Sequence, residues 1–299
     1  MAARIAWLLN LGAERELEEP RRHVVPGSSA EVSRFRAHMQ LLLRPDDRVI
    51  DVDPDLAGCS ETLAFCPTPS ALARIRALGR VPPPAPAVEV LARVNARSFC
   101  AALGQTLPDA AYVRDMPALL RVIARDVPDG FLLKRDFSFA GRERRRVLHG
   151  VLDRSTEGFA QRSFARGQGL QVEPWLARTH DFAQHGYVCE SGAVLVGAPM
   201  LQQCDARGVW QRSETLPDGA LAAHERAQLA DSLMRAGNAL AAAGYFGPYG
   251  IDAFRYVGRD GAARFQPLCE VNARFSMGYP RALLERALGV ADSRATHPG

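Results

Sequence analysis

One short stretch, residues 266–285, constrains the fold of this chain most. Residues 266–271 mix apolar and β-permissive side chains and predict a strand, and residues 281–285 predict a helix that has Pro280 in its first turn. Alternation along an extended strand places Glu270, Asn272 and Arg274 on one face. Carboxylate and amide oxygens are hard ligands suited to magnesium, and a guanidinium suits charge that develops on oxygen. A strand with a solvated polar face explains these three residues alone better, so the rest of the chain has to decide.

Length and composition bound the class of protein. The 299 residues suffice for two domains or for one domain with an inserted lid, and 47% hydrophobic with 23% charged residues is typical of a soluble globular protein. The net charge of +4 is modest and scattered, which does not indicate nucleic-acid binding. The apolar run at residues 1–9 is soon followed by several glutamates, so we expect neither a signal peptide nor a membrane span. We expect a cytoplasmic location. The six cysteines lack zinc-site spacing and are expected to be buried thiols.

The chain holds a single lysine, Lys134, among 37 basic Lys and Arg residues. A composition in which arginine replaces lysine at every basic position except one suggests that this position needs the compact charge of an ammonium. A planar guanidinium cannot provide it. Lys134 follows the apolar run 131–133 and precedes a loop.

The first 105 residues predict a small α/β unit. The expected strands are 5–11, 49–52 and 63–66, and the expected helices are 32–43, 70–78 and 94–103, with a stiff proline-rich connector at 82–86. No glycine-rich dinucleotide motif follows the first strand. The glutamates at 14, 16, 18 and 19 are expected to form a solvated face.

A second unit follows, from about 107 to 172. Its expected elements are a helix at 116–125, a strand at 130–134, a loop at 135–146 leading to another strand, and a helix at 157–165. The small residues of the loop fit a flap whose backbone amides approach phosphates, although an ordinary hairpin turn is the alternative. The arginines at 142 and 144–146 could cover phosphate or an acidic substrate, and a solvated strand edge is as good a reading.

The last part predicts strands around one long helix. A strand covers 170–176, a hairpin joins 187–189 to 193–196, a helix covers 221–243, and a strand covers 251–254. A turn at 258–261 folds this last strand back against residues 266–271. This antiparallel pairing is expected to bring Asp252 near Glu270.

Taken in order, these residues resemble the ATP-grasp superfamily, most clearly from 131 to 288 and more loosely before that. The family order is a lysine on a strand before a small-residue flap, a Glu-x-x-Leu hinge, an acidic strand and Glu-x-Asn-x-Arg, matched here by Lys134, residues 138–142, residues 173–176, Asp252 and residues 270–274. The resemblance implies an α/β and α+β architecture, the ATP-grasp fold with an N-terminal preATP-grasp α/β domain. The implied parts are 1–106 for this domain, 107–172 for the lid lobe, and 173–299 for the C-terminal lobe with the metal site.

The resemblance also implies roles for single residues. Lys134 would hold the α- and β-phosphates, the backbone at 173–176 would bind the adenine, and Asp181 would hold the ribose. The full set of implied nucleotide contacts is Arg97, Lys134, Ser138, Gly141, Glu173, Pro174, Trp175, Leu176 and Asp181. Asp252, Glu270 and Asn272 would bind two Mg²⁺ ions, for which Mn²⁺ can substitute, and Arg274 and Lys134 would act in catalysis. The chain departs from relatives in having Arg97 in place of a second lysine and only one glycine, Gly141, in its flap.

The implied function is an ATP-dependent ligase. It would activate a carboxylate as an acylphosphate and join it to an amine or other nucleophile, with release of ADP and phosphate. The partners would be small-molecule or peptide carboxylates and amines, without nucleic acid or membrane, and the oligomeric state cannot be read from the sequence. The alternatives are an ATP-grasp kinase acting on a small molecule and a nucleotide-binding regulator without turnover. The complete set of metal ligands argues against the regulator.

Overall fold

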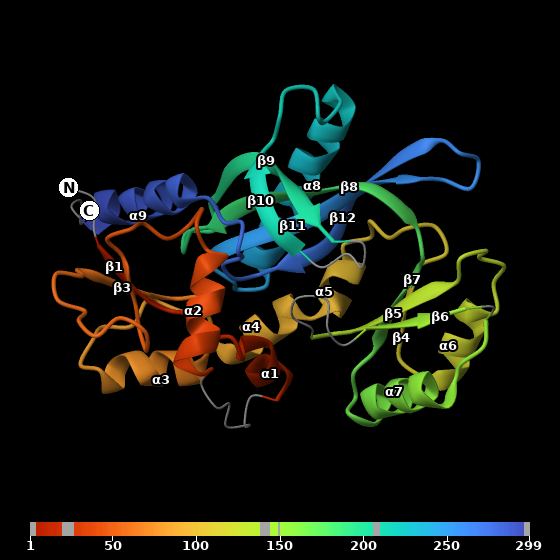
Figure 1. Ribbon diagram of the computed structural model, residues 1–299, viewed down its shortest axis with the longest axis horizontal. Helices are drawn as coiled ribbons and strands as arrows, with labels where there is room; N and C mark the ends of the chain where they lie inside the picture. Colours follow the sequence, from red (N-terminus) through yellow and green to blue (C-terminus); the bar gives the residue numbers. More distant parts are fainter. Residues whose placement is uncertain (1–3, 20–26, 138–143, 149, 206–209, 296–299) are drawn as a thin grey trace.

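The computed structural model describes residues 4–19, 27–137, 144–148, 150–205 and 210–295. Three separate sheets organise these residues, and Figure 1 shows them from the N-terminal part at one end, through the C-terminal strands, to the small four-stranded sheet at the other end. Within the described ranges, no helix combines the length and apolar character needed to cross a membrane.

The N-terminal sheet is parallel, with strand order β2-β1-β3. Its elements are β1 (Ile5–Leu8), α1 (Ala13–Glu18), α2 (Ser29–Ala37), β2 (Arg48–Val49), β3 (Glu61–Ala64) and α3 (Pro69–Ala77). The buried carboxylate of Asp47 accepts hydrogen bonds from the backbone of Ile5 (3.0 Å) and the indole of Trp7 (3.1 Å). It also pairs with Arg281 at 2.6 Å, which ties the C-terminal helix α9 (Arg281–Ala295) to this sheet (Figure 1).

The sequence predicted the three strands and the helices α2 and α3 of this part, but it placed several of their ends wrongly and did not predict α1. Helix α2 begins earlier than predicted because Ser28 and Glu31 form a capping box, and it ends at Ala37. Strand β2 has two residues, since Asp51 turns the chain with a φ of 69°.

The predicted helix 94–103 is two helices, α4 (Val88–Asn95) and α5 (Arg97–Ala102). The break lies at Ala96, whose backbone is extended with φ −73° and ψ 141°. The Asn95 side chain fixes the break by donating to the carbonyl of Ala273 and accepting from its backbone N–H. Because of this break, Arg97 starts a new helix beside the C-terminal strands.

The four-stranded sheet has the order β4-β7-β5-β6 and is antiparallel throughout. Its elements are β4 (Ala111–Val113), α6 (Met116–Ile123), β5 (Phe131–Arg135), β6 (Arg144–Val147), α7 (Arg154–Ala165) and β7 (Leu170–Pro174). Asp115 and Asp153 cap the two helices, which cover one face of the sheet (Figure 1). This part has a core of its own, in which Phe131 and Phe159 are buried.

The five-stranded antiparallel sheet has the order β10-β9-β8-β11-β12. Its elements are β8 (Ala177–Val188), β9 (Val194–Cys204), β10 (Trp210–Thr215), α8 (Ala223–Ala242), β11 (Gly247–Val257) and β12 (Ala263–Asn272). The predicted hairpin and the pairing of the last two strands are confirmed, although the strands are much longer than predicted and β10 was not predicted. A single hydrophobic core joins this sheet to the N-terminal one, so that Trp7 and Leu268 belong to the same cluster.

Candidate nucleotide and metal site

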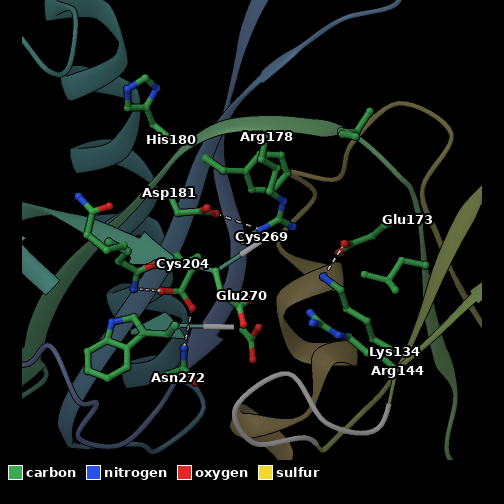
Figure 2. Close-up of a pocket in the computed structure, with 18 of the residues that line it drawn as sticks. Lys134, Arg144, Glu173, Arg178, His180, Asp181, Cys204, Cys269, Glu270 and Asn272 are labelled. Carbon is green, nitrogen blue, oxygen red and sulfur yellow. Dashed lines mark hydrogen bonds and ion pairs between the residues drawn. The ribbon is translucent and has the colours of Figure 1, made fainter. Parts of the chain in front are cut away.

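A cavity of about 800 Å³ lies between the four-stranded and the five-stranded sheets. Figure 2 shows Lys134, Arg144 and Glu173 on one side of it, across from Asp181, Glu270 and Asn272. The sequence-predicted residues that line it are Arg97, Lys134, Glu173, Pro174, Trp175, Leu176, Asp181, Asp252, Glu270, Asn272 and Arg274. Ser138 and Gly141 lie outside the described residues. The structure therefore brings together, in one cavity, side chains from all three sheets or their connecting segments.

Lys134 and Glu173 form a buried ion pair on adjacent strands. Lys134 lies on β5 and Glu173 on β7, and Nζ donates to Oε2 at 2.5 Å, with side-chain exposures of 10% and 7%. From the sequence only the backbone of Glu173 had a proposed role, so the ion pair is a contact that the sequence did not indicate. It fixes the ammonium at the cavity wall and leaves donor capacity on Nζ, since an ammonium has three N–H groups.

Two carboxylates and two amides from β9, β11 and β12 meet on the five-stranded sheet. Asp252 and Glu270 are direct cross-strand partners on β11 and β12, as the sequence predicted. The Asp252 carboxylate accepts from Gln202 at 3.0 Å and from Asn272 at 3.1 Å. Burial raises the pKa of Asp252, and the negative charge of Glu270 raises it further, to about 7.

Arg97 binds Glu270 through both ends of its guanidinium. Nη1 lies 3.0 Å from Oε2, and Nη2 donates to Oε1 at 3.2 Å. Burial alone would raise the pKa of Glu270, but the charges of Arg97 and Lys134 outweigh it and hold the pKa below its usual value. Arg97 is oriented by its Nε, which donates to the carbonyl of Arg135 at 2.9 Å.

Arg274 lies beyond the end of β12, which stops at Asn272. Its guanidinium pairs with Glu14 of α1 at 2.8 Å, lies over the ring of Phe65 at 5.1 Å, and lines the cavity. The prediction of a solvated face for the glutamates of α1 is wrong for two of them, because Glu14 and Glu16 are buried. Glu16 accepts from the backbone of Ser70 at 2.8 Å, so its role is to hold α3.

Several cavity residues were not singled out from the sequence. Arg144 faces Lys134 directly across the β5–β6 ladder, and Arg178 pairs with Asp181 at 3.1 Å while it lies over Phe254. The cavity is also lined by Phe65, Gln202, Trp210 and Met277. Arg144 could not be told from its neighbours because the three consecutive arginines look alike until the register of β6 is known.

The donor set fits a magnesium ion. Among the described residues no group of three or more His, Cys, Asp and Glu side chains forms a metal cluster, so the candidate ligands are two carboxylates and the amide oxygen of Asn272. Mg²⁺ is held in this way in phosphate sites, where waters and substrate phosphates complete the octahedron. The carboxylates of Asp252 and Glu270 lie on directly paired positions, and a bound cation would offset the repulsion that adds to burial in raising the pKa of Asp252.

No family model and no curated protein sequence matches the chain. Several solved structures are similar to it. Biotin carboxylase from Campylobacter jejuni is 15% identical with a TM-score of 0.59, over 96% of this chain and 70% of that one. The biotin carboxylase domain of Hydrogenobacter thermophilus 2-oxoglutarate carboxylase, solved with MgADP and bicarbonate, is 16% identical with a TM-score of 0.55, over 92% and 65%. D-alanyl-alanine synthetase A from Vibrio cholerae is 14% identical with a TM-score of 0.51, over 97% and 94%. These similarities and the order of its own sheets show that the chain has the ATP-grasp fold.

Proposed function

We propose that this protein is an ATP-dependent ligase that activates a carboxylate as an acylphosphate and transfers the acyl group to an amine or another nucleophile. One observation carries the proposal: Lys134 and Glu270, which lie on different sheets and far apart in the sequence, line one cavity that also contains Asp252, Asn272 and Arg274. An ammonium and a metal-binding carboxylate that address one cavity suit a triphosphate.

Each part of the cavity has a proposed task. Lys134 and Arg97 hold phosphate oxygens, the segment 173–176 contacts the adenine, and Asp181 the ribose. Asp252, Glu270 and Asn272 would hold Mg²⁺, which when bound neutralises phosphate charge. Arg274, held by Glu14, stabilises negative charge on the reacting carboxyl group.

The division of labour between the three parts of the chain belongs to the same proposal. Residues 1–106 would contribute to substrate binding, 107–172 would cover the nucleotide, and 173–299 would carry the metal ligands. The substrates would be small molecules or peptides, met in the cytoplasm.

A phosphate-release screen tests the function. Amino acids and small carboxylates are offered with ATP and Mg²⁺, alone and with amines, and hydroxylamine is added to trap an acylphosphate as a hydroxamate. A ligase gives a hydroxamate and, with both substrates, an amide plus ADP and phosphate. A stable phosphorylated product, identified by mass spectrometry, would instead support the kinase alternative, and release that is unchanged in Glu270→Gln would count against this site.

A further inference from the structure

The end of the cavity beyond Arg274 is walled by apolar side chains from three parts of the chain. Phe65 comes from the segment after β3, Trp210 is the first residue of β10, and Met277 lies in the segment before α9. This end is opposite in character to the one formed by Lys134 and Glu173, which is ionic.

Phe65 and Trp210 both pack against the C-terminal end of α2. The ring of Phe65 lies edge-on to Phe35 at 5.1 Å, and the ring of Trp210 lies edge-on to His38 at 5.6 Å. Positions three apart in a helix lie on the same side, about 5–6 Å from each other. Both aromatic residues therefore line the cavity from the same end of α2, and together they are called its apolar wall.

The segment 276–278 closes this wall on its other side. The indole of Trp210 donates to Ser213 at 3.0 Å, and a side chain on Gly278 would collide with Ser213, since a Cβ there would lie 2.3 Å from its Oγ. Only glycine permits so close an approach of the segment to β10. Met277, next to this glycine, lines the same cavity as Trp210.

One cation borders the apolar wall: the guanidinium of Arg274 lies 5.1 Å from the ring centre of Phe65. A guanidinium recognises a carboxylate through paired N–H groups, whereas aromatic and thioether side chains recognise flat or branched apolar groups. Ligand sites combine a mostly apolar lining with a few such fixed polar groups.

We propose that this end of the cavity, bounded by Phe65, Trp210 and Met277, binds the apolar side group of the carboxylate substrate, whose carboxyl group faces Arg274. The substrate class is a small carboxylate, such as an amino acid, with an aromatic or branched aliphatic side group. The assignment rests on the proposed ligase function, because it takes Arg274 as the residue that meets the reacting carboxyl.

Direct binding tests the assignment without turnover. The full-length protein, saturated with Mg²⁺ and a non-hydrolysable ATP analogue, is titrated by calorimetry with phenylalanine, leucine, 3-phenylpropionate, alanine, aspartate and 2-phenylethylamine. We expect the first three to bind at least about 10-fold more tightly than alanine and aspartate, the scale on which apolar pockets discriminate. Phenylethylamine, which lacks the carboxylate, should bind more weakly than phenylpropionate.

Matched variants locate the site. Trp210→Ala and Met277→Ala should each weaken phenylalanine binding by about 10-fold, and Trp210→Phe should retain most of it. Circular dichroism melting checks that the variants are folded. Preference for alanine or aspartate, or unchanged phenylalanine binding in both alanine variants, would overturn the assignment.

The outcomes separate this assignment from the ligase proposal. Tight, Trp210-dependent binding of phenylalanine without any phosphate release or hydroxamate supports the apolar subsite and counts against the ligase. Hydroxamate formation only with small or acidic carboxylates supports the ligase and overturns the apolar subsite.

Discussion

Arg97 and Glu270 are 173 positions apart in the sequence, yet the guanidinium of one holds both oxygens of the other, at 3.0 and 3.2 Å. Glu270 is also a proposed metal ligand. The guanidinium therefore occupies the oxygens that a magnesium ion would need, and we expect the two cations to compete for this carboxylate.

Replacing the guanidinium should expose this competition. Arg97→Met should lower the free energy of unfolding by about 1.5–3 kcal/mol, the contribution of hydrogen bonds to a charged group. Millimolar Mg²⁺ without nucleotide should then raise the melting temperature of Arg97→Met by more than that of the wild type, because the ion can take the vacated oxygens. The control Arg97→Met/Glu270→Gln should not respond, and equal shifts in Arg97→Met and the wild type would contradict the competition.

The consecutive arginines of β6 provide a matched pair of variants. Arg144 lies across from Lys134 and lines the cavity, whereas Arg145 is exposed and lies over the ring of Phe159 at 4.9 Å. We expect Arg144→Ala to weaken MgATP binding about 10-fold, as loss of one charge-assisted contact of about 1.4 kcal/mol would. Calorimetry should show no such change for Arg145→Ala, and an equal loss in both variants would indicate a general charge effect.

The parts of the site that could be predicted are those that depend on residues close together in the sequence. Lys134 was singled out as the lone lysine after an apolar strand, and the pairing of Asp252 with Glu270 followed from two strands joined by a tight turn. Short-range pairing of this kind depends on residues close in the chain.

The parts that were missed depend on contacts between distant segments. The burial of Glu14 is decided by Arg274, which lies at the other end of the chain, and no pattern in α1 itself distinguishes it from a solvated glutamate. The break at Ala96 is likewise fixed by the contact of Asn95 with Ala273. Strand β10 begins at Trp210 and pairs with β9, and it has too few apolar residues to show the alternation of a half-buried strand.

Lys134 has a structural partner as well as a proposed ligand, so its variants need a compensated control. Lys134→Met leaves the buried carboxylate of Glu173 without its cation, which typically costs about 3–5 kcal/mol. The double variant Lys134→Met/Glu173→Gln should recover stability in thermal melting, yet it should not recover MgATP binding. Lys134→Arg should also be impaired, because a longer planar fork does not fit a space shaped by an ammonium. Wild-type affinity and turnover in Lys134→Arg would show that the position needs only a positive charge.

His185 should make the stability of the fold depend on pH. The ring is buried, its Nε2 lies 2.8 Å from Ser276 Oγ, and burial lowers its pKa from 6.5 to about 4. Between these values the unfolded chain binds more protons than the folded one, so this contribution to stability is complete above pH 6.5 and is lost as the pH falls towards 4. Its size is about 3 kcal/mol. Urea unfolding of His185→Gln should therefore vary less with pH from 4 to 6.5 than that of the wild type, and parallel curves would contradict the assignment.

Arg274 is expected to act in the chemical step more than in nucleotide binding. Its guanidinium pairs with Glu14, lies over the ring of Phe65 and lines the cavity that also contains Asp252 and Glu270. There it would meet the reacting carboxyl group, whose oxygen gains most charge in the transition state, and interactions made mainly in that state change turnover more than affinity. Arg274→Ala should lower kcat by about 10²- to 10³-fold, the usual effect of one such donor. MgATP affinity, measured by calorimetry, should stay close to that of the wild type.

Since Arg274→Ala also leaves Glu14 buried without its cation, the matched control is Arg274→Ala/Glu14→Gln. This double variant should regain thermal stability but not turnover, which separates the loss of chemistry from the loss of the ion pair that joins α1 to the end of β12. Recovery of turnover along with stability would show that Arg274 acts by holding α1 in place. That result would contradict its proposed role at the reacting carboxyl group.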